Sequence, residues 1–338
     1  MTRWAITPYR GHGRDGRALL LGRVLRNETW APADPKRGGW GNLRDVWRRI
    51  EADPLPHAQV LVRCGEVLHE LEADDEGFFR GWVELPLGPG AGWHDVHLEL
   101  QHEEAAPPVK VPVLVPRADA RFGIISDLDD TVIQSQVTRF LHAARLLLLE
   151  NARTRLPFPG VAPFYEGLSD EGRNPLFYVS SSPWNLYGVL DEFLGIHGVP
   201  TGPVLLRDWD LDRSLFGNRQ HKLRLIEEIL AAHPALPFIL VGDSGQEDPE
   251  IYREVVRAHP GRIRAIYIRE VTGRASRQAA IAALADELSG SGAVLLTTPD
   301  TLDAARHAAD HGWVSPGTVD AVAAAMHATA TLPDEIEG

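Results

Sequence analysis

The sequence predicts an α/β protein with a doubly wound, Rossmann-like parallel sheet, preceded by an all-β domain. From residue 121 onward, short apolar segments alternate with helical segments, as expected for strands buried on both faces of a parallel sheet. Before residue 118, apolar and polar residues nearly alternate in short segments between turn residues, which is typical of a small β-sandwich. A chain of 338 residues is also long for one core. We therefore expect a sandwich-like domain over residues 1–117 and an α/β domain over residues 118–338.

The all-β part shows its strands most clearly where apolar residues run together or alternate with polar ones. Its expected strands cover residues 18–25, 59–63, 77–85 and 93–100. Glycine-containing residues 11–16 resemble a dinucleotide-binding fingerprint, but they do not follow a strand and open a helix, so we expect a loop there. Residues 116–120 are expected to link the two parts.

The α/β part is expected to contain six strands and at least three helices. The strands cover residues 122–126, 176–179, 204–206, 238–241, 263–268 and 293–296, and the helices 186–194, 222–232 and 278–288. In such sheets, functional residues gather at the carboxyl ends of the strands, in the crevice where strand order reverses.

Composition excludes several classes of function. The formal net charge of -13 argues against non-specific nucleic-acid binding, which depends on Lys and Arg neutralising phosphates. The single cysteine, Cys64, permits no intrachain disulfide and no multi-cysteine zinc site. Residues 1–16 have no apolar core of a signal peptide, and the apolar segments are too short to span a membrane. We expect a cytoplasmic protein that contacts lipid, if at all, only peripherally.

Four polar clusters lie where the predicted sheet would bring them together. Asp127-Leu-Asp-Asp-Thr131, Ser180-Ser-Ser182 and Gly242-Asp-Ser-Gly-Gln-Glu-Asp248 each directly follow an apolar strand, and Lys222 begins a helix. Carboxylates that converge at strand ends repel one another unless a cation joins them, and oxygen-only ligands favour Mg²⁺. A lysine and a serine hydroxyl can hold phosphoryl oxygens, while a carboxylate beside the metal can act as a covalent nucleophile. These residue types therefore predict magnesium-assisted phosphoryl chemistry.

The order of these motifs resembles the haloacid-dehalogenase (HAD) superfamily. Three segments carry a closer resemblance to the phosphatidate phosphatase APP catalytic-domain family: Ser126–Thr131, Tyr178–Asn185 and Val241–Tyr252. The N-terminal Pro8-Tyr-Arg-Gly-His-Gly13 resembles the β-rich leader of its bacterial members. The resemblance implies a HAD-like fold with a small cap inserted between the first two motifs.

The same resemblance implies a role for each matching residue in catalysis. Asp127 corresponds to the nucleophile that forms an aspartyl-phosphate, and Asp129 to the general acid and base. Lys222 corresponds to the cation that stabilises both Asp127 and the phosphoryl group. Ser180 corresponds to the hydroxyl that holds the phosphate, although Ser181 could be the true equivalent.

The metal ligands implied by the resemblance are Asp127, the backbone carbonyl of Asp129, Asp243 and Asp248. Asp243 is expected to bind Mg²⁺ directly, whereas Asp248 could be a ligand or a hydrogen-bonding neighbour of one. Thr131 could contact substrate or make only a local structural hydrogen bond.

The implied function is magnesium-dependent hydrolysis of a phosphomonoester, with phosphatidate as the substrate and diacylglycerol as the product. One alternative is a HAD phosphatase for a soluble phosphate ester. Another is an inert HAD-fold protein that serves as a binding partner or scaffold. A serine hydrolase is the more distant alternative, because Gly242-Asp-Ser-Gly245 resembles the nucleophile signature of trypsin-like proteases. Its position after a buried parallel strand is unlike those β-barrel enzymes.

The segment 138–151 lies at the expected position of the cap. It is apolar and is flanked by basic side chains, namely Arg139, Arg145, Arg153 and Arg155. It could form a cap helix packed on the core, or an amphipathic basic surface that contacts an anionic membrane.

Overall fold

The computed structural model describes residues 3–14, 16–27, 53–87, 92–128, 158–207 and 218–330. Two of the expected site residues, Asp129 and Thr131, lie outside these ranges. The expected cap segment 138–151 with its flanking arginines also lies outside them.

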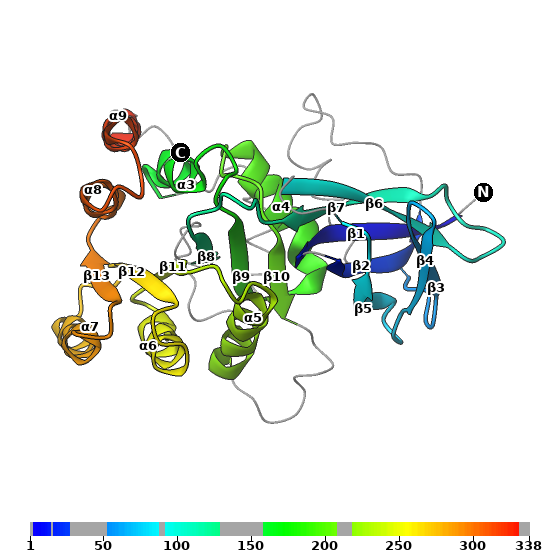
Figure 1. The fold of residues 1–338 in the computed structure, drawn as a ribbon, viewed down its shortest axis with the longest axis horizontal. Coiled ribbons are helices and arrows are strands. Elements are labelled where there is room, and N and C mark those ends of the chain that lie inside the picture. Colours follow the sequence, from blue (N-terminus) through cyan, green and yellow to red (C-terminus); the bar gives the residue numbers. More distant parts are fainter. Residues whose placement is uncertain are drawn as a thin grey trace, which may run out of the picture.

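The N-terminal strands form one seven-stranded sheet in the order β4-β3-β6-β7-β1-β2-β5 (Figure 1). The strands are β1 (Arg3–Arg14), β2 (Arg17–Asn27), β3 (Gln59–Cys64), β4 (Val67–Glu72), β5 (Phe78–Glu84), β6 (Gly92–Leu100) and β7 (Val109–Val115). Neighbours pair antiparallel except β1 and β7, which run parallel. The edge strands β4 and β5 contact each other, so the sheet is nearly closed. It is thus one curved sheet where the sequence suggested two packed sheets.

Strand β1 was not predicted, because its glycines read as a loop. Its pairing with β2 shifts between Tyr9 and His12, where β1 has one more residue than β2. Such a bulge increases local twist and helps a sheet to curve. Gly11 allows the close approach of the two strands, since a Cβ atom there would lie only 2.3 Å from the carbonyl oxygen of Leu19. The residues 11–14 are therefore strand and not loop.

The second sheet is parallel and has the order β10-β9-β8-β11-β12-β13. Its strands are β8 (Gly123–Asp127), β9 (Leu176–Pro183), β10 (Val204–Arg207), β11 (Phe238–Asp243), β12 (Ile263–Arg269) and β13 (Val294–Thr298). All six predicted strands are present, and their first and last residues differ from the predicted ones by at most four positions. Chain order reverses between β8 and β11, which lie side by side at the centre. This is the point where open α/β sheets bind ligands.

Helices lie on both sides of the parallel sheet. The helices are α3 (Val161–Ser169), α4 (Tyr187–Ile196), α5 (Asn218–Ala232), α6 (Asp248–Ala258), α7 (Ala275–Leu288), α8 (Thr301–Asp310) and α9 (Pro316–Ala330). Figure 1 shows α3, α8 and α9 on one side and α5, α6 and α7 on the other. The three predicted helices correspond to α4, α5 and α7.

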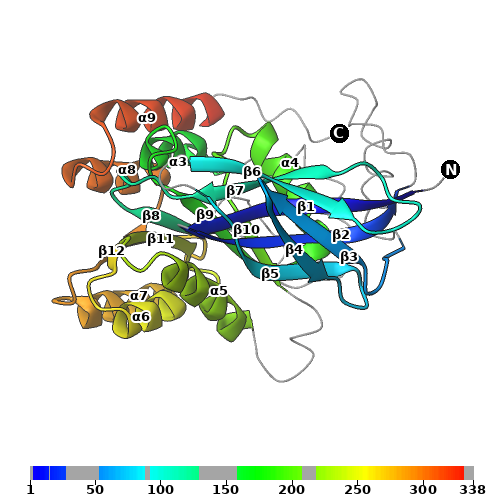
Figure 2. The same ribbon diagram turned by 45° about the vertical axis from the view of Figure 1, so that its right-hand side comes forward.

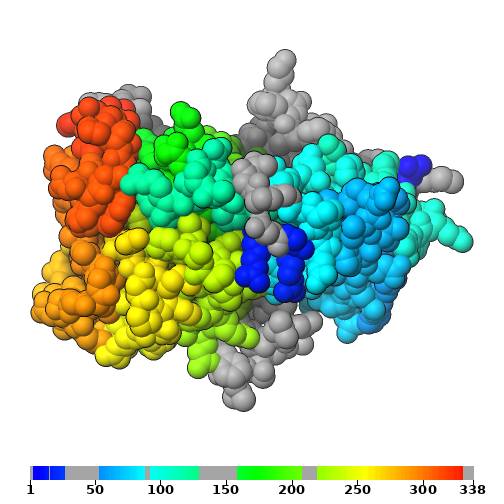
Figure 3. All heavy atoms as spheres, in the orientation of Figure 1, coloured from blue at the N-terminus to red at the C-terminus, as the bar shows by residue number. Residues whose placement is uncertain are grey.

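The two sheets share a hydrophobic core. Tyr9, Leu19, Leu21 and Leu114 of the first sheet belong to the cluster of buried residues that fills the α/β part. A second cluster, which includes Val60 and the neighbouring inward residues, lies wholly within the first sheet. Figure 2 shows the strands of the first sheet lying against the α/β part, and Figure 3 shows the atoms of the two parts adjoining each other. Burial of this shared apolar surface holds the two parts together.

Among the helices that the structure describes, none is both long enough and apolar enough to cross a membrane.

Candidate active site

Two of the expected carboxylates end neighbouring strands of the parallel sheet. Asp127 is the last residue of β8 and Asp243 the last residue of β11, and the two strands pair in register. Asp248 is the first residue of α6, directly after the loop that follows β11. All three side chains are fully buried, and one oxygen of each lies within 4.8 Å of the others. The parallel strands thus bring together carboxylates that are far apart in the sequence.

Lys222, near the start of α5, lies between two of these carboxylates. Its Nζ atom is 2.8 Å from Asp127 Oδ1 and 2.5 Å from Asp248 Oδ1. Burial alone would lower the pKa of Lys222, but the two carboxylates outweigh it and raise the pKa above the ordinary value of a lysine. Lys222 is therefore a permanent, fixed cation beside Asp127.

Asp243 is held by the loop that follows it. Its Oδ1 atom accepts hydrogen bonds from the amides of Gly245, at 2.6 Å, and Gln246, at 3.0 Å. Its Oδ2 atom is buried and has no hydrogen-bond partner within the described part of the chain. Burial and the nearby Asp248 carboxylate raise the pKa of Asp243 to about 7, although Lys222 and the two amides oppose this shift.

Asp248 has both of its oxygens engaged by the protein. Oδ1 accepts from Lys222 Nζ, and Oδ2 accepts from the backbone amide of Asp243 at 3.1 Å. Gly242 makes this approach possible, because a Cβ atom there would lie 2.5 Å from Asp248 Oδ2. Asp248 therefore links the lysine to the loop that carries Asp243.

The serine cluster lies in the last residues of β9, the strand beside β8. Asp127 pairs with Val179 in register, so Ser180 lies at the same edge of the sheet as Asp127. Ser180 is buried, and its hydroxyl oxygen accepts the amide of Ser182 at 2.9 Å. The hydroxyl of Ser181 has no hydrogen-bond partner among the residues that the structure describes. Both serines stay candidates for holding a phosphoryl oxygen.

Ser244 is poorly suited to act as a nucleophile. It is buried, and its hydroxyl accepts the amide of Val271 at 3.0 Å. Its own amide donates to the carbonyl of Arg269, so the residue joins β11 to β12. The hydroxyl serves loop structure here, which disfavours the serine hydrolase alternative.

An arginine that the sequence did not reveal holds the loop after β11. Arg277 of α7 donates to the carbonyls of Ser244, at 2.8 Å, and Gln246, at 2.6 Å, and pairs with Glu250 of α6. Beside this loop lies an open groove of about 680 Å³, to which Arg219, Arg274 and Arg277 contribute. No sequence pattern predicted the role of Arg277, because its partners are backbone carbonyls some 30 positions away in the chain.

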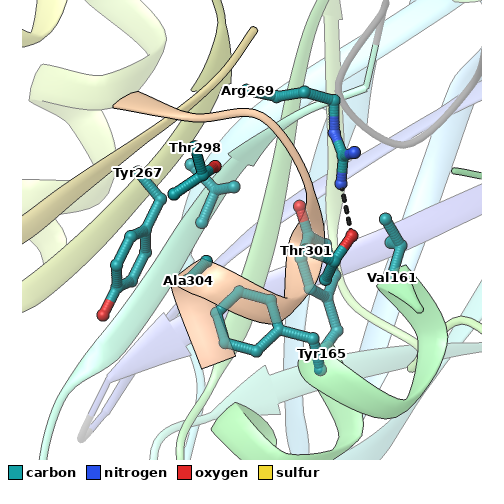
Figure 4. Close-up of a pocket in the computed structure, with 9 residues that line it drawn as sticks. Val161, Tyr165, Tyr267, Arg269, Thr298, Thr301 and Ala304 are labelled. Carbon is teal, nitrogen blue, oxygen red and sulfur yellow. Dashed lines mark hydrogen bonds between the residues drawn. The ribbon is translucent and has the colours of Figure 1, made fainter. Parts of the chain in front are cut away.

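A second group of contacts supports the end of β8. The hydroxyl of Tyr165 lies 2.7 Å from Ser126 Oγ, which also donates to the carbonyl of Asp127 at 2.7 Å. Next to Tyr165 is a cavity of about 20 Å³, room for a single water molecule. Figure 4 shows Arg269 at its edge, where it donates to Thr301 Oγ1 at 2.7 Å.

The donor set fits a hard divalent cation. Mg²⁺ is bound in proteins by one or two carboxylates together with water and substrate oxygens. Asp127 and Asp243 supply such carboxylates from adjacent strand ends, and Asp243 Oδ2 is the buried oxygen that no described residue satisfies. Asp248, with both oxygens bonded, is better placed to support the ligands.

The α/β part matches a known family. Residues 122–270 match the catalytic domain of phosphatidate phosphatase APP1. This range holds every expected site residue, from Asp127 to Asp248, and excludes the N-terminal sheet.

Two fungal proteins are similar to the chain over the corresponding length. Phosphatidate phosphatase APP1 of Saccharomyces cerevisiae is 31% identical over 159 residues, which cover 44% of this chain and 25% of that protein. An uncharacterized protein of Schizosaccharomyces pombe is 28% identical over 155 residues, with the same coverage of 44% and 25%. The alignments thus span about a quarter of the length of these relatives.

Solved structures add no argument about the fold. A carbohydrate acetylesterase from Xanthomonas citri has a TM-score of 0.27 at 13% identity, covering 85% of this chain and 65% of its own. A mutant PilB minor pilin from Streptococcus sanguinis has a TM-score of 0.28 at 8% identity, covering 82% and 90%. Similarities of this size do not establish a common fold.

Proposed function

We propose that this protein is a magnesium-dependent phosphomonoester hydrolase with a HAD-like catalytic domain, and that its substrate is phosphatidate. The observation that carries the proposal is the buried group of Asp127, Lys222, Asp243 and Asp248 at the point where strand order reverses. This group lies inside the range that matches the catalytic domain of a phosphatidate phosphatase.

The reaction proceeds in two displacements through a phosphorylated Asp127. A carboxylate oxygen of Asp127 attacks phosphorus, and the bond to the ester oxygen breaks. Asp129, which lies outside the described residues, donates the proton that the leaving alkoxide needs. In the second step Asp129 takes a proton from water, which attacks the aspartyl-phosphate and releases inorganic phosphate with Asp127 restored.

The surrounding residues lower the electrostatic cost of bringing an anion to a carboxylate. Lys222 holds a positive charge 2.8 Å from Asp127 Oδ1 and remains protonated throughout. The hydroxyl of Ser180 or Ser181 would donate to a phosphoryl oxygen. Magnesium, held by Asp127, Asp243 and the carbonyl of Asp129, would neutralise charge on the nucleophile and the phosphoryl oxygens.

Phosphatidate is proposed from the family match. Its hydrolysis yields diacylglycerol and takes place at a membrane surface, which fits a cytoplasmic protein bound peripherally. The net charge of -13 opposes approach to an anionic bilayer, so a local basic element is required. A phosphatase for soluble esters needs no such element, so this element distinguishes the two proposed substrate classes.

A substrate comparison tests both levels of the proposal. Release of inorganic phosphate would be measured from phosphatidate and lysophosphatidate in vesicles and from p-nitrophenyl phosphate, each with Mg²⁺ or with EDTA. We expect magnesium-dependent release and the highest kcat/KM on phosphatidate. Activity confined to the soluble ester would reject phosphatidate and favour the soluble-substrate alternative. No release from any substrate with Mg²⁺ present would favour the inert scaffold.

A further inference from the structure

The serine cluster is followed at once by aromatic residues that the N-terminal sheet contacts. Trp184 begins the 3₁₀ turn η1 (Trp184–Leu186), and Tyr187 begins α4. Tyr9 of β1 stacks on both: its ring centroid is 5.3 Å from that of Trp184 and 4.2 Å from that of Tyr187. All three side chains are at least 93% buried, with exposed fractions of 4% for Tyr9, 7% for Trp184 and 6% for Tyr187. Tyr9 therefore packs against the aromatic residues that follow the serine-bearing end of β9.

The next residue of β1 adds polar contacts to the same element. The backbone amide of Arg10 donates to the hydroxyl of Tyr187 at 2.9 Å. The guanidinium of Arg10 pairs with Asp191, one turn further along α4. Two consecutive residues of β1 thus hold the start of α4 by aromatic stacking, a hydrogen bond and an ion pair.

The position of these residues in β1 explains how one strand can serve both parts of the protein. Side chains alternate between the two faces of a strand, so Ile6 and Tyr9, three positions apart, point to opposite faces of β1. Ile6 lies in the core of the first sheet, whereas Tyr9 lies in the core of the α/β part. The strand itself is fixed on both sides by its pairing with β2 and β7.

We infer that Tyr9 and Arg10 are positioning residues for the proposed phosphatase, and that the N-terminal sheet is a structural part of its active site. They hold Trp184 and Tyr187, and through them the end of β9, where Ser180 accepts the amide of Ser182. The inference rests on the proposed function, because it assigns this end of β9 the task of holding the substrate phosphate. Both residues lie outside the range that matches the catalytic-domain family.

The expected consequence is specific to phosphate binding. A displacement of a substrate-holding group by about 1 Å can cost on the order of a hundredfold in rate. Loss of the Tyr9 ring leaves an unfilled space beside Trp184, so the end of β9 can shift, whereas Asp127, Asp243 and Lys222 keep their own supports in β8, β11 and α5. Phosphate contacts should therefore weaken while metal binding is retained.

The test compares Tyr9→Ala and Tyr9→Leu with Tyr9→Phe, and uses Val62→Ala as the matched control. Val62 is buried in the first sheet but belongs to the separate core of that sheet, so Val62→Ala destabilises the sheet without touching Trp184. KM, the inhibition constant of inorganic phosphate and the Mg²⁺ concentration at half-maximal activity would be measured on the substrate that the wild-type protein hydrolyses. Melting temperatures would match the variants for stability.

We expect Tyr9→Ala to raise KM and the phosphate inhibition constant about tenfold, with the magnesium requirement changed less than about twofold. Tyr9→Leu should give the same result if Tyr9→Ala does not fold. Tyr9→Phe keeps the ring and should behave as wild type, and Val62→Ala should lower the melting temperature alone. The inference would be overturned if Val62→Ala raised KM and the phosphate inhibition constant as much as Tyr9→Ala does. It would also be overturned if neither Tyr9→Ala nor Tyr9→Leu changed these constants.

Hydrogen exchange separates failure of this inference from failure of the proposed function. Amides of residues 180–187 should exchange faster in Tyr9→Leu than in Val62→Ala at matched stability. A wild-type protein without phosphatase activity would reject the proposed function, and the exchange measurement would still decide whether β1 holds the end of β9. Unchanged exchange in Tyr9→Leu would show that this segment does not depend on Tyr9.

Discussion

The Nζ atom of Lys222 lies 2.8 Å from Oδ1 of Asp127, and both side chains are shielded from solvent. A buried ion pair of this kind contributes little net stability, since desolvation offsets much of the attraction between its charges. Its value to the protein is chemical, because it fixes a cation next to the carboxylate that we propose as the nucleophile.

Replacement of Asp127 by Asn should abolish turnover without unfolding the protein. The amide keeps the shape of the carboxylate but removes the nucleophilic oxygen, so kcat should fall at least about a thousandfold. Circular dichroism and melting temperature would show that the fold persists. The matched control is Asp170→Asn, at the partly exposed end of α3, where asparagine tolerates the left-handed backbone of φ 50°. Near-wild-type hydrolysis by Asp127→Asn would rule out the covalent mechanism.

Asp243 and Asp248 should differ in their effect on the metal. The Oδ2 atom of Asp243 accepts no hydrogen bond from the residues that the structure describes, so it can bind a metal ion. Asp243→Asn should therefore raise the Mg²⁺ concentration for half-maximal activity about tenfold or more. Asp248→Asn loosens Lys222 and should lower kcat more than it raises the magnesium requirement. Magnesium titrations of both variants provide the measurement. Superimposable titration curves for Asp243→Asn and wild type would exclude Asp243 as a ligand.

Arg277 should affect the metal although it contacts none of the carboxylates of the site. It donates to the carbonyls of Ser244 and Gln246 and so holds the loop whose amides bind Asp243. Residues that orient metal ligands typically contribute 10- to 100-fold to affinity, so Arg277→Met should weaken magnesium binding by about tenfold. Arg274→Met is the control, because Arg274 is exposed in the same groove. An equal effect of the two substitutions would mean that groove charge, and not the loop contact, matters.

The protein should lose stability below about pH 6.5 through two histidines between the sheets. His12 and His233 are buried with ring centroids 5.5 Å apart. Burial, assisted by the neighbouring charges of Arg14 and Arg262, lowers the pKa of His233 to about 4. Burial, with His233 and Arg80, also lowers the pKa of His12.

The sign of the pH effect follows from these lowered values. Above pH 6.5 both rings are neutral in the folded and the unfolded chain, so they impose no penalty. As pH falls toward 4, the unfolded chain binds protons that the folded protein excludes, and His233 alone should remove about 3 kcal/mol of stability. Urea unfolding at pH 7.5 and pH 5 measures the loss. His233→Leu should reduce this difference, whereas substitution of the exposed His97 by Gln should leave it unchanged.

Much of the fold and of the candidate site could be predicted because the information is local. Asp127 and Asp243 each end a run of apolar residues, and a buried parallel strand ends where such a run meets a carboxylate. Strand direction then places both residues at one edge of the sheet. Lys222 was expected to begin its helix, but α5 begins four residues earlier, at Asn218, and the contact of Lys222 with Asp248 was not predicted.

The sequence by itself determined which chemical groups the protein possesses and at which ends of which elements they lie. Only the tertiary structure decided that the first seven strands form one sheet, that Arg277 holds the loop after β11, and that Tyr9 stacks on Trp184 and Tyr187. Arg10 and Tyr187 are separated by 177 positions in the chain. Periodicity along a chain reports which face of an element is buried, but the partner of that face depends on how distant elements pack.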